Sequence, residues 1–290
     1  MIRSMTGFGY NEYSEDGITF TIEIKTVNHR YLDIFLRIPK QISSFEDRVR
    51  SIISERIQRG KVDVYITCEN KSEDAIRVVP DEGLARAYRD ALKSMAGCLG
   101  LEDDVSVSVL ARFPDILKVE NRQDDDRMGG ILEKAVERAV SSLVEMREKE
   151  GRKLKENILQ VLETVDSYLS RIRERAPLVV KEYKEKLEER IEELAGTRLD
   201  PARLAMEVAL FADRCSIDEE IVRLESHIGQ MREMLDQGSP VGKKLDFLIQ
   251  EMNREVNTIG SKAGDLEITR CVVELKNEIE KMREQVQNIE

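Results

Sequence analysis

The chain has 290 residues, of which 41% are hydrophobic and 36% are charged, and its formal net charge is −11. This length suits about two domains, no apolar run approaches the roughly 18 residues of a membrane span, and the N-terminus lacks the apolar stretch of a signal peptide. The net charge disfavours a surface that attracts polyanions everywhere, but residues 1–80 carry 12 basic and 12 acidic side chains, which leaves room for a local basic site. The four cysteines are far apart and include no CxxC pair, so they indicate neither a zinc cage nor a disulfide framework. We therefore expect a soluble, cytoplasmic protein without membrane contact.

Alternating apolar residues near the start of the chain predict a β-sheet. The predicted strands cover residues 9–14, 17–25, 31–38 and 61–67. Between the last two strands, helical spacing begins at Ser44, the predicted N-cap with Asp47 in a capping-box position, and it ends at Gly60. This order of elements predicts a sheet with helices on one face.

The next segments are less regular. A helix is expected from about Asp81 to Leu99, and residues 103–110 are ambiguous between a strand and the start of a helix. Residues 121–130 are polar and acidic and are expected to form a loop, where we place the first domain boundary.

A long amphipathic pattern then runs almost unbroken from Ile131 to about Leu194, with Gly151 and Pro177 as its only interruptions. Such a segment makes a projecting arm, a coiled coil or a spacer, and a solvated helical hairpin is the plainest interpretation. Its apolar stripe contains Leu154, Ile158, Val161, Leu162 and Val165. Because this stripe is too apolar for an isolated hairpin, it favours assembly as a homo-oligomer.

The last ninety residues predict an all-α module. Its expected helices cover residues 204–212, 217–235, 241–259 and 266–290. The fold class is therefore α+β. The expected parts are a β-rich mixed N-terminal domain (1–126), a long helical arm or connector (127–200) and a helical C-terminal domain (201–290).

One group of residues that suggests chemistry lies between two predicted strands. Asn28, His29 and Arg30 offer an amide, an imidazole and a guanidinium, a combination suited to phosphate. His29 is one of only two histidines in the chain. The alternative is an ordinary polar turn.

The second histidine belongs to another group, on a predicted helix. Glu220, Arg223 and His227 lie at positions i, i+3 and i+7 and share one helix face. A glutamate and a histidine at this spacing suit a divalent ion or general acid–base catalysis. A surface ion pair with a histidine at the helix end explains the same pattern.

A third group occupies the helix predicted within residues 242–262. Glu251, Arg254 and Glu255 share one stripe, and the adjacent stripe is rich in Asn, Asp and Gln. Several of these residue types lower helix propensity, so something other than helix stability favours them. A packed polar interface between subunits is the alternative to a catalytic site.

The sequence resembles a known family at both ends. The N-terminal part contains MIRSMTGFG, then EIK, NHRYLD and RGKV, and the C-terminal part contains KKLDFL, QEMNRE and NTIGSK. These segments, in this order and including the motif around His29, resemble the signatures of the YicC/YloC proteins. The resemblance implies a bacterial endoribonuclease that depends on a divalent metal, cuts single-stranded RNA and assembles into a ring-like oligomer, a hexamer.

The resemblance and the three groups together yield the following assignments. The catalytic candidates are His29, Arg30, Glu220, His227, Glu251, Arg254 and Glu255. The RNA-binding candidates are Arg3, Lys25, Asn28, Arg30, Arg223, Lys244 and Lys262. The candidate ligands for Mg²⁺ or Mn²⁺ are Glu220, His227, Glu251 and Glu255.

Two mechanisms remain open at this stage. In the favoured one, a cation activates water and His29 and Arg30 position the phosphate. In the other, His29 and His227 act as an acid–base pair without metal. The low aromatic content favours backbone contacts over extended base stacking, and no DNA partner is expected. The alternative function is a non-catalytic RNA-binding or scaffold protein that assembles as a homo-oligomer.

Overall fold

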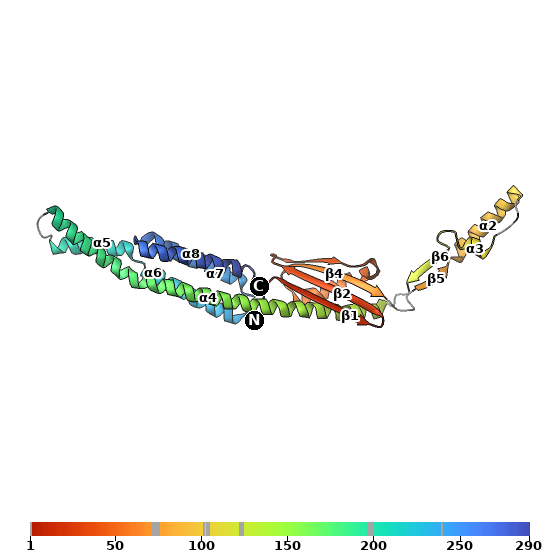
Figure 1. Cartoon of the computed structure of the whole chain (residues 1–290), viewed down its shortest axis with the longest axis horizontal. Coiled ribbons are helices and arrows are strands. Elements are labelled where there is room, and N and C mark those ends of the chain that lie inside the picture. Colours follow the sequence, from red (N-terminus) through yellow and green to blue (C-terminus); the bar gives the residue numbers. More distant parts are fainter. Residues whose placement is uncertain are drawn as a thin grey trace.

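A single helix, α4 (Asp125–Ala195), runs along most of the elongated molecule (Figure 1). It has 71 residues and is therefore about 105 Å long at the usual helical rise. The computed structural model describes residues 2–70, 76–100, 102, 105–121, 125–195, 200–238 and 240–290. The helix continues through Gly151 and Pro177, so the expected hairpin within residues 131–194 is wrong. The loop expected at 121–130 is also wrong where the structure describes it, because Asn121 ends a strand and residues 125–130 form the first turns of α4. The acidic residues that suggested a loop are favourable at the N-terminus of a helix.

A four-stranded sheet packs on the first half of this helix. The strands are β1 (Gly7–Glu15), β2 (Ile18–Val27), β3 (Leu32–Arg37) and β4 (Gly60–Asn70). Their order is β1-β2-β4-β3, and all neighbours are antiparallel except the parallel pair β3 and β4. These strands confirm the alternation seen in the sequence.

One face of the sheet forms the first hydrophobic core. Phe20, Ile22 and Ile24 of β2 point into it and meet α1 (Glu46–Arg56) and the first half of α4. Strand β1 lies so close to α4 that a Cβ on Gly9 would come within 2.4 Å of the Ala139 carbonyl oxygen. The helices therefore cover one face, as predicted, and leave the other face open.

The start of α1 differs from the prediction. A 3-10 turn, η1 (Lys40–Phe45), precedes α1. The N-cap residue of α1 is Phe45, whose side chain makes no capping hydrogen bond. Ser44 lies inside that turn, so the predicted capping box does not form. The turn carries the backbone into the helix in place of a side-chain cap.

A smaller unit projects from the end of the sheet (Figure 1). It contains β5 (Ile76–Pro80), α2 (Glu82–Leu99), α3 (Val107–Leu110) and β6 (Leu117–Asn121), with β5 and β6 paired antiparallel. Helix α2 was expected and is capped by Asp81, whose carboxylate accepts a hydrogen bond from the Leu84 amide. The two strands were not predicted. In the segment 103–110, which was ambiguous between strand and helix, residues 107–110 are helical, and residues 103 and 104 lie outside the described part of the chain.

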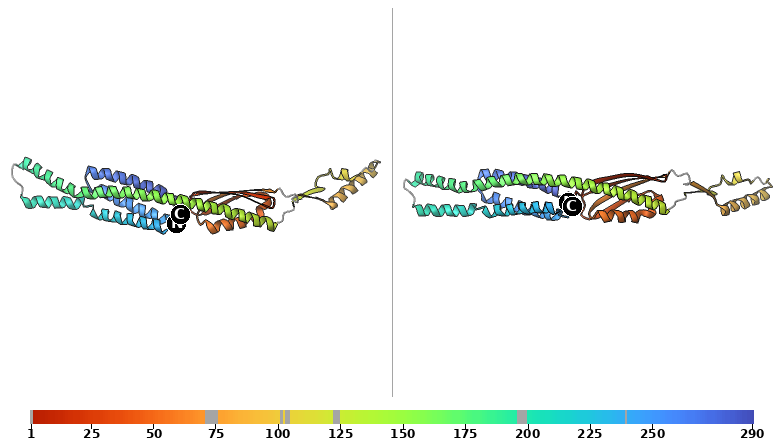
Figure 2. Two further views of the ribbon diagram at one scale, coloured as in Figure 1. Left: turned by 60° about the horizontal axis from the view of Figure 1, so that its bottom comes forward. Right: turned by 90° about the horizontal axis from the view of Figure 1, so that it is seen from below.

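The second half of α4 joins a helical bundle with α6 (Asp218–Gln237), α7 (Gly242–Lys262) and α8 (Leu266–Val286). This bundle contains the second hydrophobic core, in which Ile158, Leu162 and Val165 of α4 are fully buried. The apolar stripe that favoured oligomerisation is therefore covered by the chain's own helices. Beyond the bundle, the end of α4 and α5 (Pro201–Cys215) form an antiparallel arm (Figure 2). In this arm the rings of Tyr183 and Phe211 stack 3.7 Å apart.

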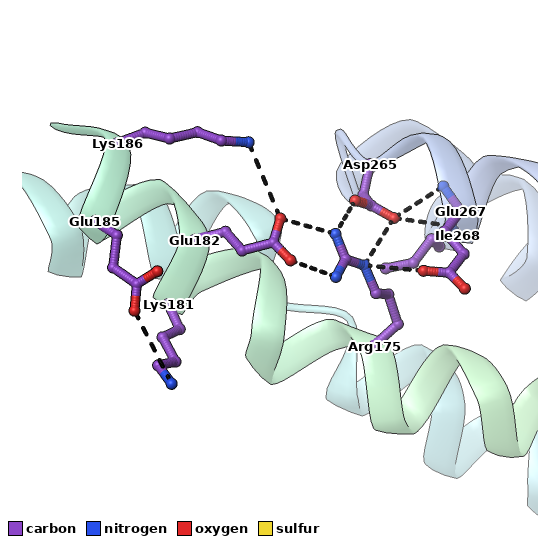
Figure 3. Close-up of polar contacts among 8 residues, drawn as sticks. All are labelled: Arg175, Lys181, Glu182, Glu185, Lys186, Asp265, Glu267 and Ile268. Atoms are coloured by element: carbon purple, nitrogen blue, oxygen red, sulfur yellow. Dashed lines mark hydrogen bonds and ion pairs between the residues drawn. The ribbon is translucent and has the colours of Figure 1, made fainter. Parts of the chain in front are cut away.

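Arg175 of α4 fastens the far end of this bundle (Figure 3). Its guanidinium lies 2.9 Å from an oxygen of Asp265 and 2.5 Å from an oxygen of Glu182. Asp265 is also the N-cap of α8, because its side chain accepts hydrogen bonds from the Glu267 and Ile268 amides. The Arg175 hydrogen bond holds the pKa of Asp265 below its usual value.

Of the helices within the described residues, none combines the length and the apolar content needed to cross a membrane.

Candidate functional site

The sheet and the bundle meet where the two ends of the chain cross the middle of α4, as both terminal labels show in Figure 1. The Ser4 amide donates to the Arg147 carbonyl (3.0 Å), and the Met5 amide donates to the Asn288 carbonyl (2.7 Å). The Arg147 side chain is only 2% exposed and donates to the Ser4 carbonyl (2.5 Å) and to the Glu290 carboxylate (2.9 Å). This arrangement, which we call the terminal clasp, fixes the position of the sheet against the bundle.

A hollow of about 250 Å³ lies next to the terminal clasp. Its charged lining consists of Arg59 from the sheet domain and Lys243, Asp246 and Arg283 from the bundle. Asp246 accepts a hydrogen bond from Gln250 (3.0 Å) and lies 4.0 Å from Arg283, so the one carboxylate of this lining faces three cations and leaves an excess of positive charge. The hollow is therefore suited to an anion.

The turn that contains the first histidine forms one wall of this hollow. Asn28 donates to the Gln287 carbonyl (2.6 Å), and Arg59 donates through Nε to the His29 carbonyl (3.0 Å). Nδ1 of His29 lies 3.1 Å from the Tyr31 carbonyl oxygen, and the Arg30 guanidinium lies over the Tyr31 ring at 5.3 Å. The side chains of His29 and Arg30 remain exposed to solvent. The turn is thus held by both domains and is more than an ordinary surface loop.

The first turn of α7 forms the opposite wall. A Cβ on Gly242 would lie 2.3 Å from the Ile289 carbonyl oxygen, so only glycine lets the helix start this close to the clasp. The helix has no side-chain N-cap and begins with Lys243 and Lys244. The amide groups and partial positive charge of a helix N-terminus favour anions such as phosphate, and the lysines strengthen this preference.

The predicted carboxylates of α6 and α7 lie elsewhere, along the contact between the two helices. Glu220 and Glu255 are each only 5% exposed. Lys262 contacts Glu220 at 2.7 Å, and Arg223 lies 4.0 Å from Glu255. Burial raises the pKa of Glu220, but the Lys262 hydrogen bond and the nearby charge of Arg223 together lower it by more. The pKa of Glu220 is therefore below its usual value. These buried carboxylates are therefore balanced by the protein's own cations.

The structure consequently separates the predicted site residues within one chain. Of the candidates, Asn28 lines the hollow. His29 and Arg30 follow it in the same turn, and Lys244 follows the lining residue Lys243 on α7. Glu220 lies about 26 Å, and His227 about 15 Å, along α6 from the end of that helix at the hollow. On α7, Glu251 and its partner Arg254 (3.9 Å) are about two turns or more away from Lys243. The remaining two candidates are also apart, because Arg3 pairs with Glu148 at 2.8 Å and Lys25 lies on the open face of the sheet.

The predicted metal ligands do not form a ready-made cage. Among the described residues, no group of three or more His, Cys, Asp or Glu side chains is arranged to hold a metal ion. One oxygen of Glu220 and Nδ1 of His227 are buried without a hydrogen-bond partner. Both residues lie at least ten residues along α6 from the end of that helix at the hollow. The chain thus fits a divalent ion only in the mode common for Mg²⁺, with one or two carboxylates and the remaining ligands from water and substrate phosphate.

Sequence reasoning missed all four charged residues of the hollow. Arg59, Lys243 and Asp246 belong to the family-like segments RGKV and KKLDFL, so the signal was present, but none of them was chosen as a site residue. Arg283 lies in a helix rich in charged residues and has no distinguishing pattern.

The described site is thus a hollow with more cations than carboxylates, between a mixed sheet and a helical bundle. The sequence matches the family description "Endoribonuclease YicC-like, N-terminal region" over residues 2–156 and "Endoribonuclease YicC-like, C-terminal" over residues 172–290. The chain belongs to this YicC-like family. It is 47% identical over 293 residues to "Probable endoribonuclease YicC" of Clostridioides difficile (strain 630). It is 34% identical over 290 residues to the protein of the same name from Haemophilus influenzae (strain ATCC 51907 / DSM 11121 / KW20 / Rd), and both comparisons cover 100% of each chain.

Proposed function

We propose that this chain is a cytoplasmic endoribonuclease that cleaves single-stranded RNA in a reaction dependent on Mg²⁺ or Mn²⁺, and that the hollow binds the RNA backbone. The observation that carries the proposal is the hollow itself, where Asn28 and Arg59 of one domain meet Lys243 and Arg283 of the other. The names of the two relatives support RNA cleavage as the activity.

The residues around the hollow suit different parts of such a reaction. Arg59, Lys243 and Arg283 surround a space in which a phosphate oxygen gains several charged donors. If Nδ1–H of His29 donates to the Tyr31 carbonyl, Nε2 carries the lone pair and can accept a proton from an attacking oxygen. In the proposed reaction His29 takes the proton of the attacking oxygen, the P–O bond to the leaving strand breaks and its oxygen takes a proton from solvent, and the cations offset the charge on the phosphate.

A bound divalent ion would lower the pKa of a water molecule and offset the charge of the phosphoryl group. Asp246 is the carboxylate that lines the described part of the hollow and is the residue placed to hold such an ion together with substrate phosphate. The metal-free pairing of His29 with His227 requires a larger rearrangement or a second chain, because His227 lies about 15 Å along α6 from the end of that helix at the hollow.

We also propose a homo-oligomer, a hexamer as the family resemblance implies. Support within the chain comes from the arm, where α5 has no buried residue and exposes Met206 and Leu210. An apolar groove of about 450 Å³, lined by Leu204, Val208 and neighbouring alanines, lies beside them. Light scattering at micromolar concentration tests this, and a monomer mass would contradict it.

Cleavage is tested with a labelled single-stranded RNA and the full-length protein, with and without EDTA. We expect cleavage only with Mg²⁺ or Mn²⁺, and at least a tenfold lower rate for Arg59→Gln and Lys243→Gln, since each loses a charged contact worth roughly 1.5–3 kcal/mol. Lys181→Gln is the matched control, because Lys181 is an exposed lysine on the distant arm that pairs with Glu185. Undiminished cleavage in EDTA that leaves cyclic-phosphate ends would refute the metal-dependent reaction, and RNA binding without cleavage under all conditions would favour the non-catalytic alternative.

A further inference from the structure

The open face of the sheet carries an unusual set of side chains. The pairing register places Phe8, Lys25, Asp63 and Phe35 in one row across the four strands, and Tyr10, Glu23, Tyr65 and Arg37 in the next. The opposite face is the one packed on α1 and α4, so these two rows face solvent. We call the two rows the sheet platform.

Aromatic rings are concentrated on and beside the platform. All the chain's Phe and Tyr residues are described, and only five of their side chains are exposed. Three belong to the platform (Phe8 39%, Tyr10 46% and Phe35 49% exposed), and Tyr31 at 64% lies just before β3 at its edge. The fifth, Phe247, lies one turn beyond Lys243 on α7. Because a ring removes 150–250 Å² of surface from water when it is buried, gathering the exposed rings at one place indicates a binding surface.

Three of the four platform rings, Phe8, Phe35 and Tyr65, have a cation beside them. The Lys25 ammonium lies 5.7 Å from the Phe8 ring and 6.0 Å from the Tyr65 ring. The Arg37 guanidinium lies 5.1 Å from the Tyr65 ring, and the Lys61 ammonium lies 4.9 Å from the Phe35 ring. Rings accompanied by Lys and Arg are the combination by which proteins hold single-stranded nucleic acid, since bases stack on the rings and the cations meet the phosphates.

The charges of the face narrow the choice of ligand. The three cations Lys25, Arg37 and Lys61 are outnumbered by the carboxylates that the register places on the same face, which are Glu12, Glu23, Asp33, Asp63 and Glu69. The face therefore has no net attraction for a polyanion, and stacking must supply the affinity. The core of a protein–protein interface is depleted of charged residues, whereas here each row combines two charged and two aromatic side chains.

The platform is also continuous with the hollow. Strand β2 ends at Val27 and leads directly to Asn28, and Arg30 lies over the Tyr31 ring between the hollow and β3. An RNA strand with one phosphate in the hollow therefore has a path along the rings.

We propose that the sheet platform is a stacking site for the bases of single-stranded RNA that extends from the hollow. This inference rests on the proposed function in taking RNA as the ligand. It departs from the expectation of backbone contacts alone, because the few aromatic residues are placed together on one surface. Stacking is tolerant of sequence, so the site adds affinity for long strands without selecting a base sequence.

The chain has no tryptophan, so a single Tyr10→Trp substitution gives a fluorescent reporter without background. We expect uridine or adenine homopolymers of about twelve nucleotides, added in EDTA, to quench this emission. Tyr13→Trp is the matched control, because Tyr13 lies on the same strand but on the covered face, under Arg138 at 4.5 Å. Quenching of both reporters alike, or of neither, would overturn the platform, as would a concentration-dependent change without RNA, which would assign the face to a protein contact.

A second measurement separates the platform from the cleavage site. The double variant Tyr10→Leu and Phe35→Leu keeps apolar bulk but removes two rings, and we expect it to bind a long strand roughly 10- to 100-fold more weakly. Its salt dependence should remain unchanged, since no cation is removed. Cleavage of a dinucleotide, whose single phosphodiester would occupy the hollow, should be unaffected. If quenching occurs without cleavage, the platform stands and the proposed nuclease activity falls. If cleavage occurs but the double variant binds long RNA as tightly as the native chain, the platform falls.

Discussion

Arg147 is expected to be the residue whose loss most affects both the stability and the site. Its guanidinium is buried and donates to the Ser4 carbonyl and the Glu290 carboxylate, and burial lowers its pKa. Arg147→Met preserves the length of the side chain but removes every donor. The Ser4 carbonyl then loses its charged donor, and Glu290, whose side chain is 13% exposed, loses its partner.

Removing one partner of a buried ion pair costs about 3–5 kcal/mol, and we take the lower end, about 3 kcal/mol, because Glu290 retains some contact with water. For 290 residues this lowers the melting temperature by about 5 °C, from an unfolding entropy of about 2.1 cal/mol/K per residue. The loss should be local first, since the clasp holds only short segments of the chain.

The assay combines thermal unfolding by circular dichroism with amide hydrogen exchange. We expect the Met5 amide, which donates to Asn288, to exchange much faster in the variant, and RNA cleavage to fall as the hollow loses its fixed geometry. Glu148→Gln is the control, because Glu148 is the next residue of α4 and its pair with Arg3 is partly exposed, which predicts a loss below about 1 kcal/mol. A change no larger than that of the control, with unchanged exchange at Met5, would refute the reasoning.

Two further predictions concern glycines in α4 and α6 and the N-cap of α8. Gly151→Ala should destabilise the protein, because a Cβ at 151 would lie 2.2 Å from the Ile2 carbonyl oxygen. Gly229→Ala should stabilise it by up to about 1 kcal/mol, because no atom lies within 4 Å of a Cβ at 229. Equal effects of the two substitutions on chemical denaturation would contradict this. Asp265→Ala should cost about 1 kcal/mol through the lost N-cap, and Asp265→Asn should cost less because asparagine also caps. Since Arg175 lowers the folded-state pKa of Asp265, the native residue adds stability above its unfolded pKa of 3.8, and this is lost as the pH falls through the lower folded value; an Asp265→Asn variant with the same acid unfolding curve as the native chain would refute that assignment.

Local patterns in the sequence determined most of the secondary structure. Alternation identified the four strands of the sheet because one face of each is buried, and helical spacing identified α2 and the helices from α4 to α8. Strands β5 and β6 escaped this reasoning, since five residues that pair only with a distant partner show too little periodicity. The long amphipathic pattern of residues 131–194 likewise indicated an extended helical segment.

Only the tertiary structure decided which residues act together. An apolar stripe on α4 has the same sequence pattern whether another chain or helices α6 to α8 cover it. In the structure, helices α6 to α8 cover it. Glu220 and Glu255 looked like metal ligands because the sequence does not show that Lys262 and Arg223 lie beside them. The hollow and the sheet platform depend on contacts between residues more than 200 positions apart and on strand register, which periodicity along the chain does not encode.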